Sequence, residues 1–376
     1  MFCGHAIHQM NHLARLKKLQ TQLERDRLDA VFILHGANIR YLCGFTGSSG
    51  VLSCCRGDWE FFTDGRYTEQ AKKQVKGARI RVDAVPPIAS AARLMGAKLK
   101  RSRSVSRIAI EREHVTLAME ARLSSELERV ASKSRFRMIE TVGLVERLRI
   151  KKDENELDQI RKSVNLASSV FPEVLRVLKP GETENSLAAE VEYLARRAGA
   201  EKMSFDTIVA SGSRSALPHA RPSLARIRRG FVVLDYGVIV GGYCSDMTRT
   251  VWLGRADRAM RNLYAAVLEA QLAGIAAVRS GVEAQQVDAA ARKILRGHKL
   301  DKYFTHSLGH GVGIEIHESP RLAKGEMQKL EAGMVITIEP GVYVAGKGGV
   351  RIEDMILVTD TGCEVLTPTS KELVIR

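Results

Sequence analysis

Five residues in the second half of the chain have the side chains of a metal site: Asp235, Asp246, His310, Glu339 and Glu353. Carboxylates and imidazole are ligands that divalent cations bind in proteins. If these five side chains converge, cations are required, because like charges a few ångströms apart cannot all ionise unless something offsets them. Two divalent ions would balance the charge of the four carboxylates in this set. The residues therefore predict a dinuclear hydrolytic centre.

The two aspartates lie in one β-rich stretch, residues 232–250. Apolar residues 232–234 precede Asp235, which places its carboxylate at the end of a buried strand. Glycines at 241–242 let the chain return as a hairpin with Asp246 on its second arm. Neighbouring strands lie roughly 4.8 Å apart, so carboxylates on the two arms can share a metal ion.

The other three candidate ligands also have distinctive settings. His310 stands between two glycines, which permit a close approach of the backbone to a ligand. Glu339 follows the apolar strand predicted at 334–338, and Glu353 lies in a strand predicted at 348–358 that glycines open. Each setting alone is common in ordinary turns and loops. It is the five together, in this order, that predict a metal site.

These segments resemble the creatinase/aminopeptidase superfamily of pita-bread metallopeptidases (family M24), in particular its branch of Xaa-Pro aminopeptidases and prolidases. The matching segments of the second half are FDTIVASGSRSALPHARPS, VLDYGVIVGGYCSDMTRT, HSLGHGVGIEIHESP, GMVITIEPGVY and GGVRIEDMILV. In the first half NIRYLCGFTGSSG and FTDGRYTEQA match as well. One departure is Phe231, where the family often has an aspartate that is not a ligand.

The resemblance implies an α+β fold with two domains. Residues 1–142 would form a smaller, creatinase-like α/β domain at the amino terminus. Residues 143–376 would form the pita-bread domain, in which helices cover a curved antiparallel sheet with pseudo-twofold symmetry. In the family the amino-terminal domain lines the mouth of the cleft and limits the length of the substrate.

The resemblance also assigns roles to the candidate ligands. Asp235 would chelate one metal ion, His310 and Glu339 the other, and Asp246 and Glu353 would bridge both. Water between two such ions is available as hydroxide near neutral pH and would attack the scissile carbonyl. Glu339 would then carry a proton to the proline nitrogen. A ligand set rich in oxygen and without sulfur favours manganese, with cobalt or zinc as substitutes.

Three histidines match family positions around the metal ions. His219, His306 and His317 would bind the substrate, and His219 and His317 would also take part in catalysis. Hydrogen bonds to the substrate carbonyl and the tetrahedral oxyanion are typically worth a few kcal/mol each. His306 and His310 have the spacing of a helical zinc pair, but the glycines around His310 favour a loop.

Arg351 lies two residues before Glu353, so on one strand the two side chains would share a face. The arginine is predicted to bind substrate by meeting its carboxyl group. The alternatives are that it positions the carboxylate of Glu353 or forms an ordinary salt bridge.

The substrate that the resemblance implies is a peptide with proline at the second position. The chain is predicted to be an Xaa-Pro aminopeptidase, which accepts peptides that continue beyond the proline. A dipeptidase (prolidase) restricted to Xaa-Pro dipeptides is the alternative, and a non-catalytic binding protein on the same fold is a remote one. Degenerate members of that kind typically lose metal ligands, whereas all five are present here. A homodimer or a larger homo-oligomer is expected.

Periodicity predicts the elements that position these residues. In the first half, helices are predicted at 12–28, 68–75, 88–99 and 117–131, and strands at 30–34, 51–55, 59–63, 80–85 and 108–111. The boundary falls near 141–152, where a long helix with acidic residues in its first turn begins. Further helices are predicted at 184–197, 257–280 and 284–300.

Composition narrows the cellular context. The 376 residues suffice for two or three domains, and the six cysteines lack zinc or redox spacing, which together with the absence of a secretory signal favours the cytoplasm. No apolar run approaches the roughly 20 residues that span a bilayer. The net charge is +15, but the basic run at 98–107 lacks interleaved aromatic residues, so we expect a solvated surface and no nucleic-acid partner.

Overall fold

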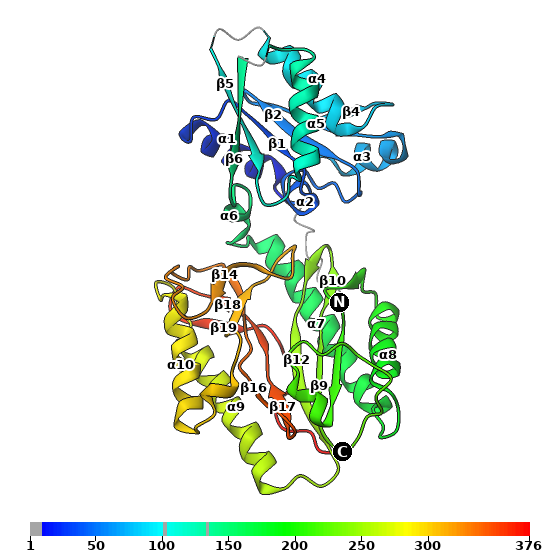
Figure 1. The fold of residues 1–376 in the computed structure, drawn as a ribbon, viewed down its shortest axis with the longest axis vertical. Coiled ribbons are helices and arrows are strands. Elements are labelled where there is room, and N and C mark those ends of the chain that lie inside the picture. Colours follow the sequence, from blue (N-terminus) through cyan, green and yellow to red (C-terminus); the bar gives the residue numbers. More distant parts are fainter. Residues whose placement is uncertain (1–9, 101–103, 133–134) are drawn as a thin grey trace, which may run out of the picture. The chain divides into compact units, whose positions relative to one another are not determined.

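The computed structural model describes residues 10–100, 104–132 and 135–376, and its contacts divide the chain into two units, Met1–Arg149 and Ile150–Arg376 (Figure 1). We call them unit 1 and unit 2. The predictions made for the first nine residues, and for the middle of the basic run, lie outside the described residues. Within the described ranges, no helix is long and apolar enough to cross a membrane.

Unit 1 is built on a mixed sheet whose described strands follow the order β4-β3-β2-β1-β5-β6. The strands are β1 (Ala30–Ile33), β2 (Val51–Cys55), β3 (Asp58–Thr63), β4 (Arg79–Val82), β5 (Ser106–Glu111) and β6 (Phe136–Thr141). β1 pairs parallel with β5 and β5 parallel with β6, whereas β2 runs antiparallel to both of its neighbours. This is the smaller α/β unit that the sequence predicts.

Helices cover this sheet. They are α1 (His12–Arg25), α2 (Gly36–Cys43), α3 (Thr68–Gln74), α4 (Pro87–Leu99), α5 (Leu117–Glu128) and α6 (Glu146–Arg149). Alternate residues of β1, Ala30 and Phe32, join one apolar cluster with Met95 of α4 and Leu127 of α5. Side chains two apart on a strand point to the same face, so this face of the sheet is the one that α4 and α5 cover.

The first half of unit 2 packs a helix pair against antiparallel strands. The helices are α7 (Glu154–Val177) and α8 (Glu184–Arg197); the strands are β7 (Lys202–Met203), β8 (Ile208–Ser211), β9 (Gly230–Tyr236), β10 (Val238–Val240), β11 (Tyr243–Cys244) and β12 (Met247–Leu253). α7 begins with a capping box in which Asp153 and Glu156 satisfy each other's backbone N–H groups. β9 lies between β8 and β12, so its apolar residues are buried.

The second half repeats this plan. Its helices are α9 (Arg258–Ala277) and α10 (Ala284–Gly297); its strands are β13 (Gly309–Gly311), β14 (Glu318–Leu322), β15 (Val335–Ile338), β16 (Gly341–Val344), β17 (Gly348–Arg351), β18 (Asp354–Val358) and β19 (Cys363–Val365). α10 begins 100 residues after α8, and each helix has 14 residues. The repeat of a helix pair and antiparallel strands is the pseudo-twofold α+β arrangement that the sequence predicts.

One predicted strand of this half is broken. Instead of one strand at 348–358, β17 and β18 are separated at Ile352 and Glu353. At the break the Ile352 N–H bonds to the Pro340 carbonyl and the Glu353 N–H bonds to the Thr248 carbonyl of the first half. Glu353 therefore lies where the chain changes its pairing partner.

Candidate metal centre

The structure brings four of the five predicted ligands into direct proximity. Ligand atoms of Asp246, His310 and Glu353 all lie within 4.8 Å of one another. His310 Nε2 is 3.6 Å from Asp246 Oδ2 and also 3.6 Å from Glu339 Oε1. These residues come from both halves of unit 2, so the centre lies where the two halves meet.

Asp235 and Asp246 are placed by the pairing of β9 with β12. Asp235 is the next-to-last residue of β9 and pairs with Thr248, while Asp246 directly precedes β12. The glycine turn at 241–242 joins β10 to β11, as the hairpin prediction requires. Both aspartates are buried, with 7% and 6% of their surface exposed.

His310 lies in the middle of β13, which two glycines allow to fit between its neighbours. A Cβ atom on Gly309 would lie 2.0 Å from the Thr337 carbonyl oxygen of β15, and one on Gly311 would lie 2.3 Å from the Ser319 carbonyl oxygen of β14. Only glycine can occupy these positions without moving a backbone. The segment is a strand, so the helical pair of His306 and His310 is excluded.

The hydrogen bond at one ring nitrogen of His310 fixes the role of the other. Nδ1 lies 2.9 Å from the Gly311 carbonyl oxygen, which can only accept a hydrogen bond. Nδ1 therefore donates, and in the neutral ring Nε2 keeps its lone pair. Burial lowers the pKa of His310 to about 4, which maintains the neutral form. A neutral imidazole with one nitrogen tied to the protein is the usual form of a metal-binding histidine.

Arg351 and Thr248 hold two of the candidate ligands. Arg351 Nη2 donates to Asp235 Oδ2 at 2.5 Å, and Arg351 Nε donates to Thr248 Oγ1 at 3.1 Å. Because that hydroxyl accepts from the arginine, its own hydrogen points to Glu353 Oε2, 2.7 Å away. One buried guanidinium therefore orients Asp235 directly and Glu353 through Thr248. Sequence reasoning placed Arg351 beside Glu353 and did not identify Thr248.

Thr337 plays a similar part for Glu339. Its hydroxyl accepts the His310 N–H at 3.1 Å and donates to Glu339 Oε1 at 3.3 Å. Thr337 is the third residue of β15, and Glu339 directly follows that strand, as predicted. Sequence reasoning missed Thr337 as well, because a threonine in a strand is ordinary.

Two carboxylate oxygens of this group are left without a hydrogen bond. Asp235 Oδ1 and Glu353 Oε1 are buried and have no hydrogen-bond partner among the described residues. A buried carboxylate oxygen without a partner is costly unless a cation meets it. The donor set is also chemically suited to divalent cations, since it combines carboxylates with one neutral imidazole. The residues therefore fit a bound metal.

The electrostatics of the centre support the same conclusion. Burial raises the pKa of Asp246 and of Glu353 well above the usual range, and it raises the pKa of Glu339 to about 8. The charges of the neighbouring carboxylates, Asp235 among them, raise these pKa values further. Without cations the centre thus favours protonated acids, and cations would reverse that preference.

The three predicted substrate histidines differ in their surroundings. His219, in a turn, and His317, in a loop, are exposed, and neither ring has a hydrogen bond to another of the described residues. His317 packs edge-on against His310, with ring centroids 4.4 Å apart. Burial is the largest cause that lowers the pKa of His317, and the charge of His219 is the second. Both rings therefore lie near the centre with their nitrogens available.

His306, in contrast, has protein partners on both ring nitrogens. Nδ1 lies 2.8 Å from the Ser307 carbonyl oxygen, and Nε2 lies 3.0 Å from the Tyr343 hydroxyl. That hydroxyl also accepts from Arg351 Nη1 at 2.7 Å, so it donates to His306. Burial lowers the pKa of His306 to about 4. Arg351 likewise uses its donors within the protein, including one to the Pro218 carbonyl oxygen.

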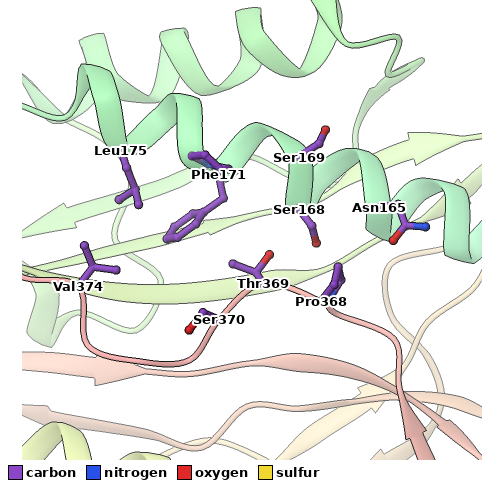
Figure 2. Close-up of a pocket in the computed structure, with 10 residues that line it drawn as sticks. Asn165, Ser168, Ser169, Phe171, Leu175, Pro368, Thr369, Ser370 and Val374 are labelled. Atoms are coloured by element: carbon purple, nitrogen blue, oxygen red, sulfur yellow. The ribbon is translucent and has the colours of Figure 1, made fainter.

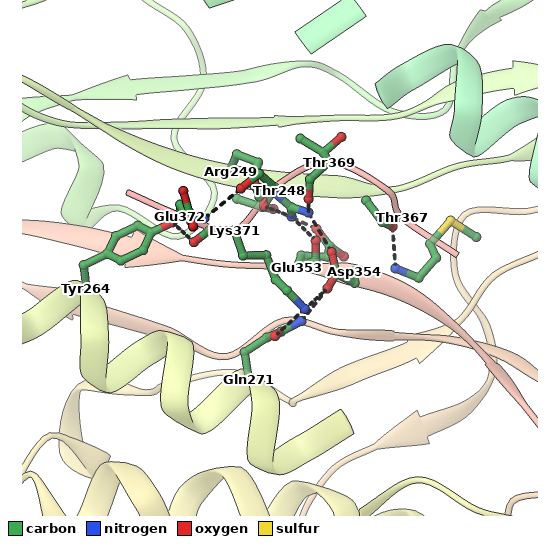
Figure 3. Close-up of polar contacts among 12 residues, drawn as sticks. Thr248, Arg249, Tyr264, Gln271, Glu353, Asp354, Thr367, Thr369, Lys371 and Glu372 are labelled. Carbon is green, nitrogen blue, oxygen red and sulfur yellow. Dashed lines mark hydrogen bonds and ion pairs between the residues drawn. The ribbon is translucent and has the colours of Figure 1, made fainter. Parts of the chain in front are cut away.

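Behind the centre, a buried ionic network surrounds Asp354 (Figure 3). Asp354 is fully buried and accepts hydrogen bonds from Arg249 Nη2 at 2.7 Å, Gln271 Nε2 at 2.8 Å and Lys371 Nζ at 2.7 Å. A fully buried carboxylate is stable only when its charge is compensated in this way. Because Asp354 adjoins Glu353, the network supports the segment that carries a candidate ligand.

Arg249 extends this support to the carboxyl-terminal segment. Besides Asp354, it donates to the backbone carbonyl oxygens of Thr248 and Glu353, and to those of Thr369 and Ser370. Figure 3 shows Thr248, Glu353, Asp354 and Thr369 around the Arg249 guanidinium. The segment from 367 to 371 is thereby fastened to the backbone of two residues of the centre.

A separate pocket of about 510 Å³ lies between α7 and the carboxyl-terminal segment (Figure 2). Its lining residues are Asn165, Ser168, Ser169, Phe171, Pro172, Leu175, Pro368, Thr369, Ser370 and Val374. In Figure 2, Phe171 and Leu175 of α7 face Thr369 and Val374. None of these lining residues is charged, and none is a predicted site residue, so the pocket offers no acid–base or metal chemistry.

The chain matches known families along most of its length. Residues 158–360 match the model of metallopeptidase family M24, and residues 15–151 match that of the creatinase/prolidase N-terminal domain. A relative named Xaa-Pro dipeptidase, from Pyrococcus furiosus, is 38% identical over 363 residues, which are 96% of this chain and 99% of that protein.

Solved structures agree with this family in fold. The Xaa-Pro dipeptidase from Bacillus anthracis superposes with a TM-score of 0.90 at 37% identity, covering 97% of this chain and 100% of that one. The X-Pro aminopeptidase from Thermotoga maritima MSB8 superposes with a TM-score of 0.86 at 33% identity, covering 94% and 100%. The architecture of unit 2 is therefore that of the pita-bread fold, as predicted.

Proposed function

The chain belongs to metallopeptidase family M24, and from this premise we propose that it is a hydrolase that cleaves the Xaa-Pro bond at the amino terminus of peptides. One observation carries the proposal: Asp246, His310, Glu339 and Glu353 converge, and in the described part of the chain no hydrogen-bond donor meets the buried oxygens Glu353 Oε1 and Asp235 Oδ1. A peptidase that had lost catalysis would have no reason to retain this arrangement.

Two divalent metal ions would be held by the five predicted ligands, Asp235, Asp246, His310, Glu339 and Glu353. When bound, such ions polarise the scissile carbonyl and make a water molecule nucleophilic near neutral pH. We propose manganese as the preferred metal because the set is rich in oxygen, with cobalt or zinc as substitutes. The protein fixes the ligands in advance through Arg351, Thr248 and Thr337.

His219 and His317 are proposed to meet the substrate, because their ring nitrogens are available beside the centre. Hydrogen bonds from these rings would stabilise the charge that develops on the carbonyl oxygen during hydrolysis. His306 would act indirectly, because its ring accepts a hydrogen bond from the Tyr343 hydroxyl, and that hydroxyl accepts one from Arg351. Arg351 would orient Asp235, to which its Nη2 donates.

Glu339 is proposed to transfer the proton to the proline nitrogen. Its Oε1 accepts from Thr337, which leaves Oε2 to carry a proton. The proline nitrogen would be a strongly basic anion if it left unprotonated, so it must gain a proton as the C–N bond breaks.

The length of the substrate is a second question. Sequence analysis predicts an aminopeptidase, which accepts a chain beyond the proline. Relatives named Xaa-Pro dipeptidase are 38%, 37% and 35% identical to this chain, and an X-Pro aminopeptidase is 33% identical. A dipeptidase therefore fits the comparisons at least as well as the aminopeptidase that the sequence predicts. A homodimeric assembly and a cytoplasmic location remain predictions of the sequence.

The test is a paired assay with manganese-loaded protein. We expect cleavage of Xaa-Pro substrates and none of matched Xaa-Ala peptides; comparing Xaa-Pro dipeptides with Xaa-Pro-Yaa tripeptides then distinguishes the two lengths. Asp246→Ala and Glu353→Ala should abolish turnover, whereas Asp158→Ala, an exposed acid of α7, should not. Protein that binds metal and cleaves neither peptide length would refute the peptidase assignment. Turnover retained in either ligand variant would remove that residue from the metal site.

A further inference from the structure

We propose that Lys152 is a positioning residue, which acts through Glu318 to hold the loop 312–317 so that His317 faces the metal centre. The inference rests on the proposed function, because it concerns how His317 reaches the substrate. Neither residue is among the predicted ligands or substrate residues.

Lys152 and Glu318 form an ion pair that water scarcely reaches. Lys152 Nζ is 3.1 Å from Glu318 Oε2, and their side chains are 1% and 7% exposed. Lys152 Nζ also donates to the Ile150 carbonyl oxygen at 3.2 Å. The next lysine, Lys151, contrasts with it, because its 3.0 Å pair with Glu331 is more than half exposed on both sides.

Glu318 organises the loop that precedes it. Its Oε1 accepts the Glu315 N–H at 3.1 Å, and the Gly313 N–H bonds to the Glu315 carbonyl oxygen at 3.0 Å. A Cβ atom on Gly313 would lie 2.6 Å from the Glu318 carboxylate oxygens, so the backbone packs directly against this group. The loop therefore packs around a carboxylate whose charge Lys152 compensates at 3.1 Å.

The position of the loop 312–317 determines how the His317 ring lies against the His310 ring. Glu318 begins β14, which pairs with β13 through Gly311 and Glu318, with a register shift directly after His310. His317 stands immediately before this strand, and its ring meets that of His310 at 70°. A shift of the loop would therefore move the His317 ring relative to a predicted metal ligand.

The backbone around Lys152 is held by hydrogen bonds to the segment that precedes β15. The Lys152 N–H bonds to the Gly333 carbonyl oxygen at 2.8 Å, and Lys151 forms a β-bridge with Met334. Met334 directly precedes β15, and Glu339 directly follows that strand. One end of the ion pair is thus anchored to the segment that precedes β15, and the other end begins β14, which pairs with β13, the strand that holds His310. The ion pair therefore links two segments that adjoin strands next to predicted ligands.

A buried ion pair could also serve stability alone, because removing one partner leaves an uncompensated charge. The two roles differ in their coupling to His317. If Lys152 acts through His317, then Lys152→Met has little further effect once His317 is removed. If Lys152 serves stability only, then its effect on kcat/KM is the same in both backgrounds.

The experiment is a double-mutant cycle on the manganese-loaded full chain. We expect Lys152→Met to lower kcat/KM for an Xaa-Pro substrate about tenfold, and less than about twofold in a His317→Ala background. Lys152→Arg should recover part of the loss, since it retains the charge. Lys151→Met is the matched control and should leave kcat/KM unchanged.

Hydrogen exchange provides a readout that does not depend on activity. The amides of residues 312–317 should exchange faster in Lys152→Met than in the wild type or Lys151→Met. If Lys152→Met fails to fold, Glu318→Gln takes its place, because it keeps the shape of the side chain while removing the charge.

The outcomes separate this proposal from the proposed function. Unchanged exchange in the loop, or equal losses of kcat/KM in both backgrounds, would overturn the role of Lys152. A His317→Ala variant with full activity would overturn it as well. Wild-type protein that lacks Xaa-Pro hydrolysis yet shows the faster exchange in Lys152→Met would instead refute the peptidase function and leave the loop assignment standing.

Discussion

Metal-free protein should lose stability as the pH rises from 6.5 to 8. In the folded chain burial raises the pKa of Glu339 from 4.5 to about 8, and it raises those of Asp246 and Glu353. A carboxyl group with a raised pKa binds its proton more tightly when the chain is folded. The stability that it contributes is present below the unfolded pKa and is lost as the pH approaches the folded pKa.

The size of the expected loss in unfolding free energy follows from the width of the pH range. Each pH unit removes about 1.4 kcal/mol per group that is protonated when folded and ionised when unfolded. Between pH 6.5 and 8, ionisation of Glu339 alone lowers the free energy of unfolding by about 2 kcal/mol, and Asp246 and Glu353 lower it further. The window starts at 6.5 because His306 and His310, whose pKa burial lowers to about 4, change stability in the opposite direction below it.

The measurement is urea unfolding of chelator-treated protein, followed by circular dichroism at several pH values across this window. Manganese-loaded protein is the control, and its stability should vary less, because bound metal keeps the ligands deprotonated. Glu339→Gln is a second control and should reduce the slope of the metal-free protein by about 1.4 kcal/mol per pH unit. A metal-free stability that stays constant or rises from pH 6.5 to 8 would refute the reasoning.

Three further substitutions test the framework of the centre. Thr248→Val removes the hydroxyl that orients Glu353, and we expect roughly tenfold weaker manganese binding by titration calorimetry, whereas unchanged affinity would exclude that role. Gly309→Ala places a Cβ atom 2.0 Å from the Thr337 carbonyl oxygen, so metal binding should be lost or the chain should fail to fold; normal binding would contradict the close approach. Arg249→Met leaves buried acceptors uncompensated, so the free energy of unfolding in urea should fall by about 3–5 kcal/mol. A fall of less than about 1 kcal/mol would contradict this role of Arg249.

The candidate ligands could be singled out from the sequence because they lie beside strong local patterns, and the structure brings four of them together. Asp235 follows three consecutive apolar residues of β9, and Glu339 follows the apolar β15 and precedes Pro340. The helix predicted at 184–197 matches α8 residue for residue, because Thr183 caps it and the apolar face is regular. Such local sequence patterns predict the structure correctly where the tertiary contacts favour the same conformation.

What sequence analysis missed depends on contacts between distant residues. Thr248 lies 105 residues from the carboxylate that it orients, and nothing in its own neighbourhood distinguishes it from other strand threonines. α2 (Gly36–Cys43) was not predicted, because it has only eight residues and His35 offers no side-chain cap. The break at Glu353 arises from a bond to the first half of unit 2, which periodicity cannot reveal.

The fastening of residues 367–371 behind Glu353 sets an order of events during translation. The ribosome makes the chain from the amino terminus, and domains generally fold in that direction. When Glu353 has been synthesised, Arg249 still lacks its acceptors at Thr369 and Ser370, and Asp354 lacks Lys371. A nascent chain that stops short of these residues already contains all five candidate ligands but lacks the support that fixes one of them. We therefore expect loading with metal to follow the synthesis of this segment.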